Sequence, residues 1–232
     1  PPPAANYAAF ARQQQAQIAD GSLDRAAATW ARELEGLQFT PSLPSDLPRP
    51  PAQCGLGAEL AISLAPDTVA GLTRFARAQG GTAFAALLAA LGVVLARASG
   101  QRRLLVGAPT SGRTSPEWED VGGYFSNTVP VLLDFRGVTD FAGAVAGARD
   151  GVLASLPREH IPLERLIQAV RPPRSPAYSP LFQTLFSLHP RAMIPPALAD
   201  LEVTRLPSPP EPARYDLTLL LTPTLAGGLE GM

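Results

Sequence analysis

The stretch Thr82–Arg113, TAFAALLAALGVVLARASGQRRLLVGAPTSGR, decides the fold class. Residues 83–98 are apolar nearly all round, and Thr82 stands where a helix N-cap is favoured. Gly100 ends the helical pattern, and an apolar run from Leu104 to Ala108 then leads into a polar loop. A helix that is buried on most sides and is followed by a buried strand predicts an α/β protein.

The rest of the chain repeats this alternation of helix and strand. A helix capped by Ser22 has apolar residues spaced along one face, namely Leu23, Ala27, Trp30, Leu34 and Leu37. Other predicted helices cover residues 4–19 (with Tyr7, Phe10 and Ile18 as core contacts), 67–79, the segment from a cap at Thr139 to 156, and a shorter one starting at Pro162. Predicted strands cover residues 59–64, 129–135, 181–188, 201–206 and 215–221. We therefore expect a two-layer α/β sandwich, a mixed β-sheet flanked by helices.

A proline-rich segment, residues 39–53, separates the first two helices from the rest of the chain. Proline lacks the backbone donor that helices and inner strands need, so this segment is expected to run extended over a surface. We predict one domain over residues 1–232, with a helical and proline-rich lead-in (1–57) and an α/β sandwich (58–232).

Composition narrows the classes of function. The net charge is −1 and no basic stripe is present, so we expect no nucleic-acid partner. The single cysteine, Cys54, and the separated histidines, His160 and His189, form no disulfide framework or metal pattern. No apolar run reaches membrane-spanning length and no signal peptide is evident, so we expect no membrane partner and a cytoplasmic location. All 19 basic residues are arginine, which is typical of a GC-rich bacterial genome.

Two polar loops stand at the ends of predicted strands, where α/β proteins usually place function. The first is Pro109–Arg113, and the second is residues 122–128 of the stretch VGGYFSNTVPVLLDF (121–135). Their residues also suit ordinary turns, because glycine adopts positive φ and Ser and Asn bond to nearby backbone. Nucleotide-binding loops, nucleophile elbows and metal-spaced histidine pairs are missing from the sequence.

Several motifs in a fixed order allow a family to be recognised. They are VGAPTSGR (106–113), GGYFSNT (122–128), Pro162-Leu163-Glu164, RSPAYSPL (174–181), LPSDLPRP (43–50) and the helix ATWARELEGL (28–37). Together they resemble the condensation domain of nonribosomal peptide synthetases, in its C-terminal half. The resemblance implies a lobe with the fold of chloramphenicol acetyltransferase and a place in bacterial secondary metabolism, such as antibiotic biosynthesis.

The departures from this family pattern bear on activity. The catalytic signature His-His-x-x-x-Asp-Gly is absent, and Ala9 stands where a following acidic residue is usual. Arg158 replaces a histidine or asparagine, and Leu163 replaces a phenylalanine; we interpret these two differences as packing variations. The chain is therefore expected to be a lobe truncated at both ends, lacking the family's final strand and helix, and to be inactive by itself.

The resemblance also implies a reaction and partners. Condensation domains join a donor acyl group to an acceptor amine, each held as a thioester on the phosphopantetheine arm of a carrier protein. This chain would supply the tunnel wall opposite the lobe that carries the catalytic histidine. The implied partners are the upstream N-terminal lobe, donor and acceptor peptidyl carrier proteins, and an adjacent adenylation domain. The chain itself is expected to bind no cofactor and no metal. The alternative is a non-catalytic condensation-like domain that recruits a partner enzyme or carrier protein.

The resemblance assigns roles to the residues of the two loops. The expected tunnel residues are Asn127, which is the first choice, then Ser111, with Tyr124, Phe125 and Thr128 shaping the tunnel. Gly112, Gly122 and Gly123 are expected to give the loop its backbone shape, and Arg113 to anchor it. No catalytic residue is expected within the chain.

Overall fold

The computed structural model describes residues 5–40, 43–190, 203 and 212–232. Its helices are α1 (Tyr7–Ala19), α2 (Ser22–Glu33), α3 (Pro66–Ala78), α4 (Ala83–Ser99), α5 (Phe141–Ser155) and α6 (Leu163–Val170). Its strands are β1 (Ile62–Leu64), β2 (Arg103–Thr110), β3 (Asn127–Asp134), β4 (Thr184–Leu188), β5 (Leu217–Pro223) and β6 (Leu229–Gly231). Two short 3₁₀ turns, η1 (Pro116–Trp118) and η2 (Leu156–Arg158), complete the set.

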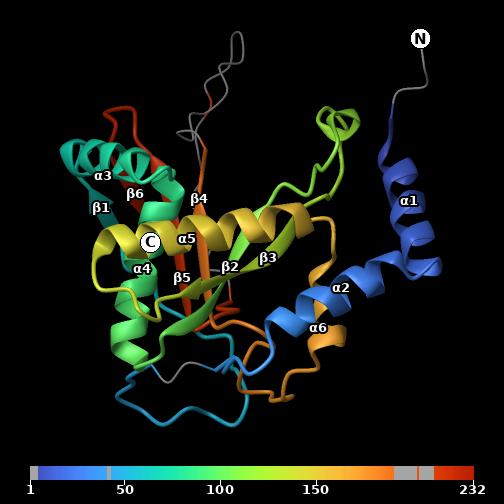
Figure 1. Cartoon of the computed structure of the whole chain (residues 1–232), viewed down its shortest axis with the longest axis horizontal. Coiled ribbons are helices and arrows are strands. Elements are labelled where there is room, and N and C mark those ends of the chain that lie inside the picture. The colour runs from blue at the N-terminus through green and yellow to red at the C-terminus, as the bar shows by residue number, and fades with distance from the viewer. Residues whose placement is uncertain (1–4, 41–42, 191–202, 204–211) are drawn as a thin grey trace.

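The strands form one mixed sheet in the order β1-β6-β5-β4-β2-β3. The central strands β2, β4 and β5 are parallel, whereas β3, β6 and β1 pair antiparallel to their neighbours. Figure 1 shows α4 and α5 lying across this sheet, and α2 and α6 beside its β3 end. The predicted α/β class, a mixed sheet flanked by helices, is confirmed.

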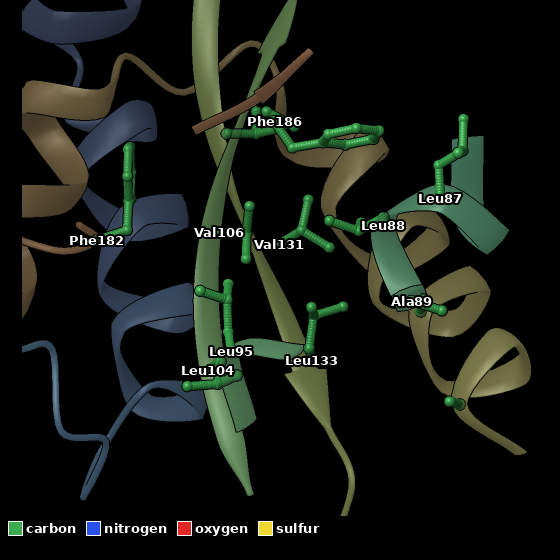
Figure 2. Close-up of a cluster of buried hydrophobic side chains, with 14 of the residues drawn as sticks. Leu87, Leu88, Ala89, Leu95, Leu104, Val106, Val131, Leu133, Phe182 and Phe186 are labelled. Atoms are coloured by element: carbon green, nitrogen blue, oxygen red, sulfur yellow. The ribbon is translucent and has the colours of Figure 1, made fainter. Parts of the chain in front are cut away.

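The main core lies between the sheet and helix α4. Val106 is paired with Val131 and Leu104 with Leu133, so their side chains share one face. Glycine at position 92 lets α4 approach closely, because a Cβ there would collide with Leu133 and Phe135. Figure 2 shows Leu87, Leu88 and Ala89 of this helix on one side of β2 and β3, with Phe182 on the other side.

The opposite face is also closed near β2. A Cβ at Gly107 would collide with the ring of Phe182, so glycine leaves room for that ring beside the strand. Phe182 stacks in turn on Tyr215, with ring centroids 5.4 Å apart. This second contact connects β2 to the segment that enters β5.

The lead-in helices differ in how they pack. The buried side chains of α2 include Leu23, Ala27 and Trp30, as the helical spacing predicts, and the helix packs against α6. Helix α1 has no buried residue, so the expected burial of Tyr7, Phe10 and Ile18 in the main core is wrong. Figure 1 shows α1 away from the sheet, at the end of the molecule that carries η1.

Several element ends differ from the prediction. The cap of α5 is Asp140, whose carboxylate accepts from the Gly143 N–H at 2.8 Å, rather than Thr139. Pro162 is the cap before α6 rather than its first residue. Strand β1 spans three residues, and β6 was not predicted. The strand predicted at 201–206 falls outside the described residues apart from position 203.

Within the described ranges, no single helix is long and apolar enough to cross a membrane. Helices α3 and α4 meet the length and composition test only as a pair, and the chain bends by 100° between them.

Candidate functional site

The loop of residues 111–126 joins β2 to β3 and contains nearly all the predicted site residues. Its two ends are paired, because Thr110 lies opposite Asn127 in the last antiparallel register of the β2–β3 ladder. Each flanking strand is eight residues long. The loop therefore projects from a fixed base, which is the arrangement that rigid scaffolds give to functional loops.

Asn127 fastens this base to the turn between α5 and α6. Its Nδ2 donates to the carbonyl oxygens of Glu159 at 2.8 Å and Ile161 at 2.7 Å. Its Oδ1 accepts from the N–H of Thr128 at 2.9 Å and of Leu163 at 3.3 Å. An asparagine amide has two N–H donors and two lone pairs, so these four bonds use its whole capacity.

Arg113 anchors the loop from within. Its guanidinium donates to the carbonyl oxygens of Trp118 and Val121, the latter at 2.9 Å. The same group lies 4.3 Å from the centre of the Phe125 ring, within the range of a cation–π contact. The backbone N–H of Arg113 also donates to Oγ of Ser111 at 3.3 Å. One side chain thus bridges both arms of the loop.

An aromatic cluster holds the loop from the side of α1. Phe125 is only 5% exposed, and its ring centroid lies 4.6 Å from that of Phe10 and 5.2 Å from that of Tyr7. Trp118 is also buried and packs against Phe10 at 5.7 Å. The position of α1 and that of the loop are therefore linked. The loop-side member of this cluster, Trp118, was missed, although a tryptophan within the polar run SPEWED is a signal of local packing.

The three glycines have different roles. Gly112 has φ of 65°, and a Cβ there would collide with the carbonyl of Phe125, so the crossing of the two loop arms requires glycine. A Cβ at Gly123 would collide with the ring of Tyr7. Gly122 has open space around it and an ordinary φ, so nothing in the structure requires glycine at this position.

Three of the predicted residues keep a side chain that other molecules can reach. Ser111 is exposed and Tyr124 is 78% exposed. Thr128 is half-buried, and because side chains alternate along a strand it points away from the side on which Asn127 is bonded. The predicted set therefore divides into supporting residues, Asn127 and Phe125, and accessible ones.

The surroundings of the two histidines bear on whether described residues could transfer a proton. His160 is exposed and its Nδ1 lies 3.1 Å from the carbonyl oxygen of Pro157. Neither His160 nor His189 forms an ion pair with a carboxylate among the described residues. Those residues also contain no group of three His, Cys, Asp or Glu side chains arranged to hold a metal.

Comparison with known proteins gives a consistent result. The family model described as "Condensation domain" matches residues 1–230. A component of the linear gramicidin synthase of Brevibacillus parabrevis is 33% identical over 223 residues, which are 95% of this chain and 3% of that protein.

Solved structures share the fold. A four-domain nonribosomal peptide synthetase, holo-AB3403, superimposes with a TM-score of 0.83 at 23% identity over 94% of this chain and 18% of that one. The condensation domain of the polyketide synthase MokA superimposes with a TM-score of 0.80 at 21% identity, over 97% of this chain and 55% of that one. The chain thus spans about half of a solved condensation domain and a small part of a synthetase.

Proposed function

The chain belongs to the condensation-domain family, and from this membership we propose that it forms one wall of the tunnel in which a peptide synthetase makes an amide bond. The substrates would be a donor acyl thioester and an acceptor aminoacyl thioester, each delivered on the phosphopantetheine arm of a carrier protein. The chemistry needs a free amine and a thioester carbonyl held in contact. The amine nitrogen bonds to the carbonyl carbon, the C–S bond breaks, and the donor arm leaves as a thiol.

The loop 111–126 is the observation that carries this proposal. Three independent supports hold it: the bonds of Asn127, the bonds of Arg113, and the packing of Phe125. Its outer surface meanwhile presents accessible hydroxyl groups at Ser111 and Tyr124. Polar groups fixed in advance stabilise developing charge without reorganising during the reaction, so a rigid loop with open hydroxyls suits a tunnel wall.

The predicted tunnel residues enter this proposal in two roles. Ser111, Tyr124 and Thr128 line the tunnel, and Asn127 and Phe125 support the wall from behind. This assignment changes the emphasis of the sequence-based hypothesis, because the amide of Asn127 is fully bonded to the backbone of its own chain.

The proton-handling group would come from outside the described residues. Because the described histidines lack a carboxylate partner, we propose that the base lies on an N-terminal lobe carrying the family's histidine signature. The other proposed partners are the two carrier proteins and an adenylation domain. The names of the relatives support this setting, since they are synthetases of peptides.

The test is reconstitution. The chain is joined to an upstream lobe with the histidine signature, mixed with loaded donor and acceptor carrier proteins, and assayed by mass spectrometry for the acceptor-bound amide. We expect product from the joined protein and none above the carrier-only background from the chain alone. Carrier binding without product, in a protein whose histidine signature is intact, would contradict catalysis and support the recruiting role instead.

The loop is tested in the same joined protein. Ser111→Ala should lower turnover by up to about 100-fold, the effect of losing one oriented donor. Ser63→Ala is the control, because Ser63 is exposed on β1 at the other edge of the sheet. Equal turnover of the two variants would contradict the role of the loop as a wall.

A further inference from the structure

The turn that Asn127 holds is also joined to helix α2. Arg158, the last residue of η2, donates from Nη1 and Nη2 to the two carboxylate oxygens of Glu33, each at 2.6 Å. Its guanidinium lies 5.4 Å from the centre of the Trp30 ring, which is itself buried. Bidentate arginine–carboxylate pairs fix orientation as well as distance.

The placement of this pair along the chain gives it a special role. Arg158 immediately precedes Glu159, whose carbonyl oxygen is one of the two acceptors of Asn127. The second acceptor, Ile161, follows after one more residue. The clamp formed by Arg158, Glu33 and Trp30 therefore fixes the start of the same turn that Asn127 fixes at its middle. Because the turn is held both at Arg158 and by Asn127, its backbone carbonyl groups are held in one position.

The clamp is unlike an ordinary stabilising ion pair. The side chain of Arg158 is 26% exposed and that of Glu33 is 49% exposed, and pairs this open to water contribute little to global stability. A large effect on unfolding is therefore not expected from its loss. A local effect is expected, because without the clamp the start of the turn loses its contact with α2 and keeps the bonds of Asn127 and contacts within the turn itself.

We propose that Arg158 is a positioning residue, which pairs with Glu33 across Trp30, fixes the 159–163 turn against Asn127, and so sets the position of the loop 111–126. This inference rests on the proposed function only where it concerns turnover. It also gives a reason for arginine at 158, where the family usually has histidine or asparagine. The sequence alone predicts a packing variation at this position, whereas in the structure Arg158 makes a specific polar contact with Glu33.

A second ion pair on helix α2 provides a matched control. Arg165 of α6 approaches Asp24 of α2 at 3.4 Å, through one nitrogen only. Both pairs connect the α2 helix to the segment after α5, and both are partly exposed. They differ in that Arg158 adjoins a carbonyl bonded by Asn127, whereas Arg165 lies beyond the turn.

The first measurement is hydrogen exchange in the complete domain, over the peptide that contains the N–H of Leu163. Arg158→Ala and Glu33→Ala should each speed exchange at this site by about fivefold, the factor for losing roughly 1 kcal/mol of local stability. The exchanged pair Arg158→Glu with Glu33→Arg should restore slow exchange. Arg165→Ala should leave it unchanged. Unchanged exchange in Arg158→Ala, or an equal rise throughout the protein, would overturn the positioning role.

The second measurement is amide formation by the same variants. Loss of the clamp should lower kcat with little change in KM for either loaded carrier protein, and the exchanged pair should restore it. Faster exchange with unchanged kcat would overturn the connection from the clamp to the loop. The proposed function is tested separately by reconstitution with the unaltered chain, so the two failures are distinguishable.

Discussion

At the scale of single residues, Asn127 should contribute to stability, because its amide makes four hydrogen bonds to backbone groups. Asn127→Ala leaves two carbonyl oxygens and two N–H groups without their partner in a part-buried site. Each such group costs up to about 1–3 kcal/mol if water does not replace the bond, so we expect a loss of roughly 2–4 kcal/mol in the free energy of unfolding. Urea denaturation of the variant and the parent chain measures it.

Asn127→Asp sharpens this prediction. Aspartate keeps the size of the side chain but replaces its two donors with an oxygen that faces the carbonyls of Glu159 and Ile161. It should destabilise at least as much as alanine does. Ser111→Ala is the control and should change stability by less than about 0.5 kcal/mol, since Ser111 is exposed. An Asn127→Asp variant as stable as the parent would contradict the assigned hydrogen bonds.

The phenol of Tyr215 should make the free energy of unfolding depend on pH in the alkaline range. Burial raises the pKa of its phenol above the ordinary value of 10.0, because the charged form loses hydration, although nearby Arg214 lowers the pKa by a smaller effect. The folded state therefore holds this proton more tightly than the unfolded state does. The protonated phenol therefore contributes to the free energy of unfolding in full below about pH 10. This contribution is lost as the pH rises from 10 through the pKa of the folded state.

The measurement is urea denaturation from pH 8 to pH 11 for the parent chain and for Tyr215→Phe. Phenylalanine keeps the stacking on Phe182 and removes the titrating group. We expect the variant to lose less stability above pH 10 than the parent chain loses. If the free energy of unfolding of the two proteins fell equally with pH, burial would not be raising the pKa of the Tyr215 phenol.

At the scale of elements, helix α5 protects the free edge of strand β3. Small residues four apart along the helix, Gly147, Gly151 and Ser155, lie next to the edge carbonyls of Asp134, Leu132 and Pro130 in turn. Ser155 donates from Oγ to the oxygen of Pro130 at 3.2 Å. A proline at this outward position also removes a donor from the edge. The longest strand edge in the sheet is thereby covered rather than left open for pairing.

Gly151 should therefore tolerate no side chain. A Cβ there would collide with the backbone oxygen of Leu132, which lies within a strand and has little room to move. Gly151→Ala should destabilise by about 1–3 kcal/mol despite the better helix propensity of alanine. Gly71→Ala in α3 is the matched control, because the nearest atom to its Cβ would be an arginine tip at 3.9 Å. It should be neutral or stabilising by up to about 1 kcal/mol, and thermal denaturation compares the two. A Gly151→Ala variant with the same melting temperature as Gly71→Ala would contradict the close contact between Gly151 and the Leu132 carbonyl.

Elements whose formation depends on nearby residues could be predicted from the sequence, and elements that depend on distant partners could not. Helix α4 and strand β2 follow from the apolar pattern and the cap at Thr82, since these act within one segment. Strand β6 has only three residues, too few to show an alternating pattern, and it pairs both with β5 just before it and with β1 more than 160 positions earlier. The same holds for the site. The sequence predicts its polar loop, but the partners of Asn127 are backbone groups, which no residue type in the sequence identifies.

At the scale of the whole molecule, the proline-rich lead-in is part of the folded body. Arg49 pairs with both carboxylate oxygens of Asp216, donates to the carbonyl of Ala177 at 3.0 Å, and lies 4.1 Å from the centre of the Tyr178 ring. The pairing with Asp216 raises the pKa of this guanidinium further, so it stays charged at all relevant pH values. Backbone bonds from Gln53 to Pro176 and from Ala213 to Gly55 extend the contact. One side chain therefore joins the lead-in to the segment after α6 and to the entry of β5.

Loss of this contact should open the lead-in before the sheet unfolds. Leu56 is 85% exposed, so the bond before it is a suitable site for thermolysin once the segment detaches far enough to enter the protease. Arg49→Ala should speed cleavage there by about tenfold, which corresponds to roughly 1.4 kcal/mol for a bidentate pair with an added aromatic contact. Arg136→Ala is the control, because Arg136 pairs with Asp134 only two residues away and joins no separate segments. Asp216→Ala should behave as Arg49→Ala does, and the double variant should add little further, since both remove one shared interaction. Cleavage at the same rate in the Arg49 and Arg136 variants would mean that the prolines and backbone bonds hold the lead-in without Arg49.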